Sequence, residues 1–367
     1  MSRLMPFLLT CDPGLEDACA MEANSITLPS QISIAEIEKN SSTIQLNASE
    51  EAIPELLKMR TIYHLGFFLT EIKDSSDGAN LIETICKWAE TAGVTGITDD
   101  TPGTFRVLTE RNGQHPFNSN DVERAVGAIF VRRSKKKVNL KNADTILRIE
   151  IRKNNAKIGL QINREPLDKR WKWEYRPRVS LRTTIAAAML IVAKKYCTSN
   201  QTDKSDNMQT KVFSVIDPFC GSGTTLLEAS VAFPSAELFA SDNDPEAVAG
   251  TIRNALVAGV ADRINIEQLD ARELGSHFQQ ERFDICLANT PFGIRMGTRI
   301  NFRNFYAQLL DSLATVMRPG GVCVLLIGKK RGLFNYVLKD KPEWQQCDAR
   351  VIEIGGSFPG MFVLRKI

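Results

Sequence analysis

The chain of 367 residues contains little histidine and no closely spaced cysteine pair. It has three His and eight Cys, and no two Cys stand in a CxxC spacing, so the ligand patterns of zinc sites are absent. We therefore predict no metal site. Cys220, Cys286 and Cys323 fall within apolar or glycine-rich segments, which indicates buried, reduced thiols and predicts a cytoplasmic protein.

Long hydrophobic runs are also missing. The longest apolar stretches, residues 185–193 and 322–327, fall well short of the roughly 20 residues that a membrane helix needs. The apolar stretch before Cys11 is too short for a signal peptide, so residues 6–10 are interpreted as a first strand. The sequence thus predicts no membrane association.

Neither sign of charge dominates overall, but the charges are unevenly distributed. The net charge is +3, whereas residues 1–100 hold 6 Lys+Arg against 16 Asp+Glu, and residues 130–182 hold 17 against 5. Trp171, Trp173 and Tyr175 alternate with basic residues in the second segment, which is typical of a polyanion-binding surface. A solvated charged face is the alternative, but the basic excess extends over several predicted elements. The candidate RNA contacts are Lys135, Lys136, Lys137, Arg170, Lys172, Arg178 and Arg182.

The length predicts two or three domains. We predict an α+β domain over residues 1–100, a second α+β domain over 101–165, a basic linker over 166–184 and a third domain over 185–367. A helix over 119–130 should be opened by Asn120 and Asp121. From residue 212 onward strands and helices alternate, which indicates a parallel sheet covered on both faces. The predicted strands are 212–217, 237–242, 264–269, 283–289 and 321–327. The predicted helices are 224–232, 245–258 and 302–317, and the last of them is ended by Arg318-Pro-Gly-Gly. Residues 348–354 and 361–365 are predicted to form a final antiparallel hairpin.

A glycine-rich turn follows the first strand of the third domain. Gly221 and Gly223 let the backbone approach a ligand, and the next helix offers free N–H groups at its start. Leu226 stands where a dinucleotide-binding motif needs a third glycine, which argues against a dehydrogenase. Asp217 is suited to accept a cationic group such as the methionyl ammonium of S-adenosylmethionine (AdoMet). The cofactor residues predicted here are Asp217, Pro218, Cys220, Gly221, Gly223 and Thr224.

Acidic residues follow the next two strands as well. Asp242 and Asn243 lie about 20 residues past the glycines, where a carboxylate is placed to accept ribose hydroxyl groups. Asp270 and Ala271 follow the third strand and should border the adenine. Each acid alone is equally explained as a helix cap. Together, at the carboxyl ends of successive strands, they predict one cofactor site.

The fourth strand ends in Asn289-Thr290-Pro291-Phe292, and this tetrad specifies the reaction. An amino group on an aromatic base is a poor nucleophile because its lone pair is delocalised into the ring. The side-chain carbonyl of Asn289 and the backbone carbonyl of Thr290 can each accept one N–H, while Phe292 stacks on the base and Pro291 stiffens the turn. Catalysis would then consist mostly of positioning. We predict an AdoMet-dependent amino methyltransferase with a seven-strand, Rossmann-like sheet.

The catalytic tetrad is accompanied by further characteristic segments, and the whole set comprises residues 105–107, 113–119, 121–127, 138–144, 164–170, 178–188 and 289–295. Together these segments resemble the THUMP-domain RNA methyltransferases, in which a ferredoxin-like unit and a THUMP domain precede the catalytic domain. The resemblance implies methylation of the N2 amino group of a guanosine in tRNA. The form Asn289-x-Pro-Phe-Gly-x-Arg295 is most similar to the branch of the family that acts on the acceptor stem. A stem guanosine at about position 6 must leave the base stack to react. Thr290 stands where such enzymes often have Pro, and Arg295 is a candidate contact to phosphate or base.

Other functions remain alternatives at this point. A 23S rRNA guanosine-N2 methyltransferase would have the same domains. A catalytically silent THUMP RNA-binding scaffold is a second alternative, against which the intact Gly221, Gly223, Asp242 and Asn289 argue. A DNA adenine methyltransferase should carry Asp/Asn-Pro-Pro-Tyr and a DNA-recognition domain, which this sequence does not show. The predicted partner is tRNA rather than DNA, and the sequence leaves open whether a helper subunit is needed.

Overall fold

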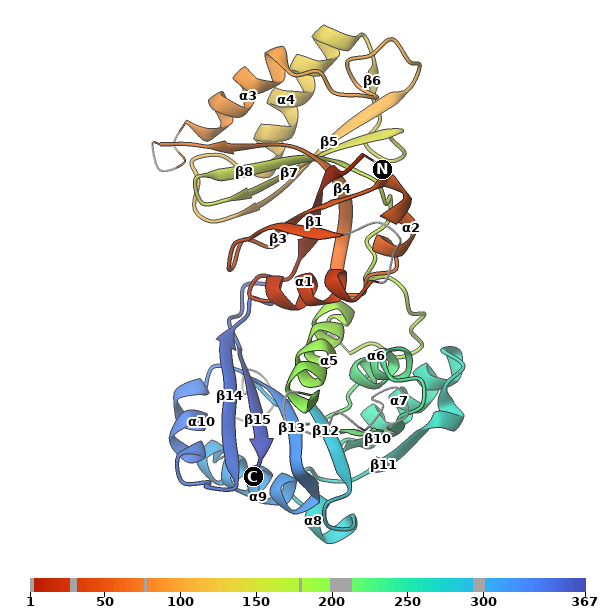
Figure 1. Ribbon diagram of the computed structural model, residues 1–367, viewed down its shortest axis with the longest axis vertical. Helices are drawn as coiled ribbons and strands as arrows, with labels where there is room; N and C mark the ends of the chain where they lie inside the picture. Colours follow the sequence, from red (N-terminus) through yellow and green to blue (C-terminus); the bar gives the residue numbers. More distant parts are fainter. Residues whose placement is uncertain are drawn as a thin grey trace. The chain divides into compact units, whose positions relative to one another are not determined.

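The computed structural model describes residues 3–26, 32–75, 78, 80–177, 180–198, 213–292 and 301–367. The chain divides into two compact units (Figure 1). The N-terminal unit comprises Met1–Thr10 and Ala23–Leu167, and the C-terminal unit comprises Cys11–Glu22 and Asp168–Ile367. A short segment from the beginning of the chain therefore belongs to the unit formed by its second half. No helix among the described residues has both the length and the apolar character that a membrane crossing demands.

The N-terminal unit is built on one eight-stranded sheet with the order β2-β3-β1-β4-β8-β7-β5-β6. Strand β4 pairs antiparallel with β8, so the two domains predicted over 1–100 and 101–165 share this sheet. Their boundaries stay predictions. In chain order, the elements up to residue 161 are β1 (Met5–Cys11), α1 (Glu16–Ser25), β2 (Ser33–Ile37), β3 (Thr43–Ala48), η1 (Glu50–Ala52), α2 (Ile53–Leu56), β4 (Ile62–Lys73), α3 (Leu81–Thr91), β5 (Thr104–Asn112), α4 (Ser119–Ser134), β6 (Lys137–Val138), β7 (Thr145–Arg152) and β8 (Asn155–Gln161). Cys11 and residues 16–22 of α1 belong to the C-terminal unit.

Helices α3 and α4 lie together on one face of this sheet (Figure 1). Their apolar residues, among them Ile85, Val126 and Phe130, bury against Phe105 and Ile149 of the strands. Burial of such side chains contributes about 1.5–3 kcal/mol each, which fixes the two helices on the sheet.

The start of α4 differs from the prediction. Asn118, not Asn120, is the N-cap: its side chain accepts the N–H of Asp121, and the Asp121 carboxylate accepts the N–H of Asn118. This reciprocal capping box satisfies two backbone donors that the first turn would otherwise leave unpaired. The prediction of Asn120 and Asp121 as caps was wrong because it overlooked this reciprocal pair.

The C-terminal unit contains a seven-stranded sheet with the order β11-β10-β9-β12-β13-β15-β14, in which β15 alone runs antiparallel to the other strands. This confirms the predicted Rossmann-like sheet with a final antiparallel hairpin. The elements are α5 (Thr183–Thr198), β9 (Ser214–Asp217), α6 (Thr224–Ala232), β10 (Glu237–Asp242), α7 (Pro245–Val257), η2 (Ala261–Arg263), β11 (Ile264–Gln268), α8 (Leu274–His277), β12 (Phe283–Asn289), α9 (Phe302–Val316), β13 (Met317–Ile327), α10 (Arg331–Leu338), β14 (Trp344–Val351) and β15 (Gly360–Lys366).

Both faces of this sheet are buried because successive side chains of each strand alternate between two cores. Ile285 and Leu287 of β12 pack with α5 and α6, whereas Cys286 and Ala288 pack with α9 and α10. Leu15, the residue directly before α1, joins the first core. The near-continuous apolar run of β12 is explained by this double burial.

Two features of the C-terminal unit were not predicted correctly. Helix α9 ends at Val316, as predicted to within one residue, but β13 begins at Met317 and not at the predicted residue 321. Residues 318–321 form an irregular insertion in this strand, between the pairs Phe283–Met317 and Ile285–Val322. Helix α10 was not predicted at all. Its apolar residues Phe334, Val337 and Leu338 are buried, but the pattern extends over only eight residues.

Candidate active site

The carboxyl ends of β10, β9 and β12 lie side by side at the point where the chain reverses its direction along the sheet. Open α/β sheets bind ligands at such a switch point. The turn after β9 contains Gly221 with φ +53° and Gly223 with φ +79°. A side chain at Gly221 would meet only the Phe219 carbonyl oxygen, at 3.9 Å, so this glycine leaves open space beside the turn. Gly223 instead packs tightly, because an added Cβ would lie 2.9 Å from Thr251 Cγ2.

Asp217, at the end of β9, is a fully buried carboxyl group. Burial raises its pKa to about 7, although hydrogen bonds from the Thr225 hydroxyl and the Phe219 N–H (2.9 Å) act in the opposite direction. The nearby Asp242 carboxylate raises the pKa of Asp217 further, and burial also raises the pKa of Asp242. None of the described residues forms an ion pair with either acid, and two desolvated carboxyl groups of this kind favour a positively charged ligand. These residues thus fit the methionyl group of AdoMet, as predicted for Asp217.

Asp242 is tied to the glycine turn. One of its carboxylate oxygens accepts the Gly221 N–H at 3.0 Å and the other accepts the Asp244 N–H at 3.1 Å. The Cys220 N–H donates to the Ser241 carbonyl oxygen at 3.0 Å. The structure therefore brings Asp217, Cys220, Gly221 and Asp242 together, as the cofactor prediction required.

The remaining predicted cofactor residues occupy less informative positions. Asp270 is held by Arg272, whose Nε and second guanidinium nitrogen donate to its two oxygens at 2.9 and 2.6 Å, so its carboxylate already has a partner. This hydrogen bond lowers the pKa of Asp270. Asn243 is exposed after β10. The others, Pro218, Thr224 and Ala271, are buried beside the turns that carry the site.

The tetrad after β12 is fixed by Thr290. Both its N–H (3.2 Å) and its hydroxyl (2.7 Å) donate to the carbonyl oxygen of Leu326 in the neighbouring β13. This double hydrogen bond holds the turn in place against β13. In contrast, the Asn289 Oδ1 atom is buried and accepts no hydrogen bond from the described residues. A buried acceptor without a donor costs about 1–3 kcal/mol, so it indicates a ligand N–H.

Phe292 lies against Gly328, the first residue after β13. An added Cβ at Gly328 would stand 2.7 Å from both Cβ and Cγ of Phe292, so only glycine allows this contact. The ring and Pro291 are half-buried. Sequence reasoning missed Gly328, although a glycine directly after a strand at the ligand-binding edge was a usable signal.

Sequence reasoning also missed Asn254, which joins the basic linker to the glycine turn. This buried amide of α7 accepts the N–H groups of Glu174 and Tyr175, each at 2.9 Å. It donates to the carbonyl oxygens of Tyr175 (2.7 Å) and Ser222 (2.9 Å). All four bonds are within the C-terminal unit. A single Asn in an amphipathic helix gives no sequence signal for such a network.

The candidate RNA contacts have different environments. Arg170 donates from Nε to the fully buried Glu228 at 2.9 Å, and Arg182 pairs with Asp12 at 2.9 Å. Lys136 is buried and donates to Asp99 at 2.6 Å. These three cations therefore satisfy structural carboxylates. Lys135, Lys137 and Lys172 are exposed, whereas Arg178 and Arg295 lie outside the described residues.

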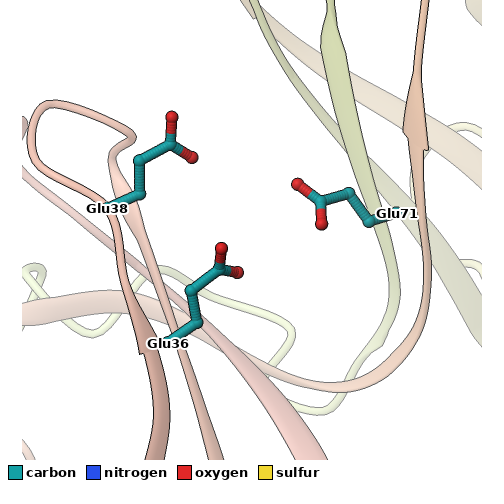
Figure 2. Close-up of side chains that lie close together, drawn as sticks. All are labelled: Glu36, Glu38 and Glu71. Atoms are coloured by element: carbon teal, nitrogen blue, oxygen red, sulfur yellow. The ribbon is translucent and has the colours of Figure 1, made fainter.

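One cluster of carboxylates lies away from this site, in the N-terminal unit. Glu36, Glu38 and Glu71 point toward one another in Figure 2. The ammonium group of Lys157, whose side chain is 5% exposed, lies 3.0 Å from Glu36 and 3.9 Å from Glu38. Because this buried ammonium provides the positive charge among the carboxylates, the cluster is explained as an ion-pair network.

The fold and this site together define a methyltransferase, and comparisons with known proteins give the family. Residues 170–359 match the RMKL-like methyltransferase domain, and residues 87–161 match the THUMP domain. A tRNA (guanine(6)-N2)-methyltransferase from Thermus thermophilus is 31% identical over 98% of this chain and 98% of its own. One of the same name from Archaeoglobus fulgidus is 26% identical over 97% and 91%. The crystal structure of TrmN from Thermus thermophilus matches with a TM-score of 0.71 and 28% identity over 99% of this chain and all of that one. The chain belongs to the family of RMKL-like methyltransferases with a THUMP domain, and it uses AdoMet as methyl donor.

Proposed function

We propose that this enzyme methylates the N2 amino group of a guanosine in tRNA, at position 6 of the acceptor stem. The observation that carries the proposal is the buried Oδ1 of Asn289 at the carboxyl end of β12, which accepts no hydrogen bond from any residue that the structure describes. An amino group bound there gives this oxygen the N–H donor that it lacks. Relatives that match almost the full length of the chain bear the name of this activity.

The residues of the chain act by holding the reacting groups. Asn289 Oδ1 accepts one N–H of the guanine amino group, and the Thr290 carbonyl accepts the other. Two accepted hydrogen bonds favour the pyramidal form of the nitrogen, in which its lone pair is available, and Phe292 stacks on the base. AdoMet, when bound, supplies an electrophilic methyl carbon. We assign its charged methionyl end to Asp217 and its ribose to Asp242.

The exposed lysines Lys135, Lys137 and Lys172 are proposed to contact the RNA backbone. Lys136, Arg170 and Arg182 instead form ion pairs with carboxylates of the protein and are proposed to contribute to the fold. Backbone contacts by lysine make RNA binding depend strongly on salt. We also propose a cytoplasmic location, supported by the finding that all eight cysteines are free thiols.

The activity is tested by incubating an unmodified tRNA transcript with the protein and AdoMet, followed by nucleoside mass spectrometry. We expect N2-methylguanosine, mapped to position 6. A methylated 23S rRNA fragment beside an unmethylated tRNA would instead support the ribosomal alternative. Absence of AdoMet binding in isothermal titration would support the non-catalytic scaffold.

The role of Asn289 is tested with the variant Asn289→Ala. We expect turnover to fall at least about 100-fold, because the loss of one pre-positioned group commonly has this effect, while AdoMet affinity stays within about twofold. The matched control is Asn289→Asp, which keeps an acceptor oxygen and should lose less activity than the alanine variant. Unchanged turnover in Asn289→Ala would falsify the catalytic assignment.

A further inference from the structure

A second group of residues lies at the same edge of the sheet as the catalytic tetrad. Gly328 contacts Phe292 and is followed by Lys329 and Lys330, which lead into α10. On the other side of β13, Ile327 pairs with Gly360, the first residue of β15. The turn between β14 and β15 therefore comes to the carboxyl end of β13, next to the strand that carries the tetrad.

Lys329 and Lys330 are exposed, and neither forms an ion pair with any residue that the structure describes. This distinguishes them from Arg170, Arg182 and Lys136, which neutralise carboxylates of the protein. An unneutralised pair of lysines beside a catalytic turn attracts a polyanion, and each lysine can bind one phosphate group.

Phe358 projects from the β14–β15 turn with 56% of its surface exposed. The turn itself is firmly hydrogen-bonded: Ile354 and Ser357 exchange two N–H···O bonds of 2.8 and 2.9 Å, and the Ile352 N–H donates to Pro359 at 3.1 Å. A rigid turn thus presents a large apolar ring to the solvent beside the catalytic edge. Rings and other apolar side chains in such positions enter the base stack of nucleic acids that are opened by a protein.

We propose that Lys329, Lys330 and Phe358 form an RNA-docking rim beside the active site. The lysines bind the phosphates next to the target guanosine, and Phe358 stacks in the gap that the guanosine leaves when it turns out of the helix. This inference rests on the proposed function, because it assumes a base-paired guanosine as substrate. It assigns to the C-terminal unit an RNA contact separate from the basic residues of 130–182.

The charge component is tested with the double variant Lys329→Gln/Lys330→Gln. We expect kcat/KM for the tRNA transcript to fall at least about tenfold, and the slope of log RNA affinity against log salt to decrease by about 2, one for each lysine. AdoMet affinity, measured by isothermal titration, should not change. The matched control is Lys339→Gln, an exposed lysine at the end of α10, about 12 Å along the helix from Arg331. Equal losses in both variants, or an unchanged salt slope in the double variant, would overturn the assignment.

The stacking component is tested with Phe358→Ala on two transcripts, one with guanosine 6 paired and one with it mismatched. We expect kcat to fall about tenfold on the paired transcript and much less on the mismatched one, because an unpaired base is already partly out of the stack. An equal loss of kcat on both transcripts, or no loss on either, contradicts the proposed stacking of Phe358. The RNA affinity of the lysine variants is measured without AdoMet, so it tests the RNA-docking rim even if the wild-type protein methylates no tRNA. The rim and the proposed methyltransferase function can therefore fail independently.

Discussion

At the scale of single residues, the most informative group is the Asp217 carboxyl. Burial and the neighbouring Asp242 raise its pKa to about 7, far above the 3.8 of an exposed aspartate. The folded protein therefore holds a proton at Asp217 more tightly than the unfolded chain does. Between pH 3.8 and about 7, this group makes the free protein less stable as the pH rises, because the unfolded state gains more from ionisation. A bound cation stabilises the ionised carboxylate of the folded protein and so counteracts this loss of stability.

AdoMet affinity should therefore depend on pH through Asp217. We expect the Kd to decrease as the pH rises through about 7 and to increase about tenfold per unit well below it, since binding a cation requires the ionised carboxylate. Isothermal titration in buffers of different ionisation enthalpy should show proton release below pH 7. The control Asp217→Asn should bind AdoMet weakly at every pH. Identical Kd values at pH 6 and pH 8 in the wild type would contradict this role.

At the scale of elements, the tetrad depends on the strand beside it. Thr290 uses both its N–H and its hydroxyl to hold the Leu326 carbonyl of β13. Substitution by Pro would remove the N–H and the hydroxyl together, so the rigidity that other enzymes obtain from Pro is obtained here by hydrogen bonding.

The variant Thr290→Val keeps the shape of the side chain but removes the hydroxyl. We expect the free energy of unfolding to decrease by about 1–2 kcal/mol and kcat to fall about tenfold, because the Asn289 and Thr290 acceptors are no longer held in place. Thermal unfolding and steady-state kinetics measure the two effects. Thr290→Ser keeps the hydroxyl and should behave nearly like the wild type; a loss as large as that of the valine variant would mean that packing of the methyl group, not the hydrogen bond, matters.

The sequence predicted those elements whose signals are local. The apolar strand before Asp217 and the turn after Asn289 were recognised because adjacent residues define them. Asn254, Gly328 and the pairing of Arg182 with Asp12 were missed, because each depends on a partner far away in the chain. The same reason explains Lys136: its charge suggested RNA binding, but only the fold shows that it is buried beside Asp99.

At the scale of the whole molecule, the segment Cys11–Glu22 belongs to the C-terminal unit. Leu15 is buried in the core of that unit, and Asp17 forms an ion pair with Arg350 of β14. The Glu353 N–H donates to the Pro13 carbonyl at 3.1 Å. Stability of the second half of the chain thus depends on residues from its beginning.

This dependence is tested with Leu15→Ala. We expect the C-terminal unit to lose about 2–5 kcal/mol of unfolding free energy, the usual cost of a buried Leu→Ala change. Amide hydrogen exchange should accelerate in α5 and β15 and stay unchanged in β3. The control Leu46→Ala, at a fully buried position of β3, should show the opposite pattern. Faster exchange in β3 of Leu15→Ala would contradict the division into units.

The position of Cys11–Glu22 also sets an order of events during synthesis. Asp17 leaves the ribosome long before Arg350, which stands 333 residues later. Until β14 has been translated, Leu15 and its neighbours have no complete core to enter, and they remain available to chaperones or to non-native contacts. A messenger RNA cut short before the codons of β14 would therefore yield a protein unable to bury Leu15 and its neighbours, which exposes the truncated product to proteolysis.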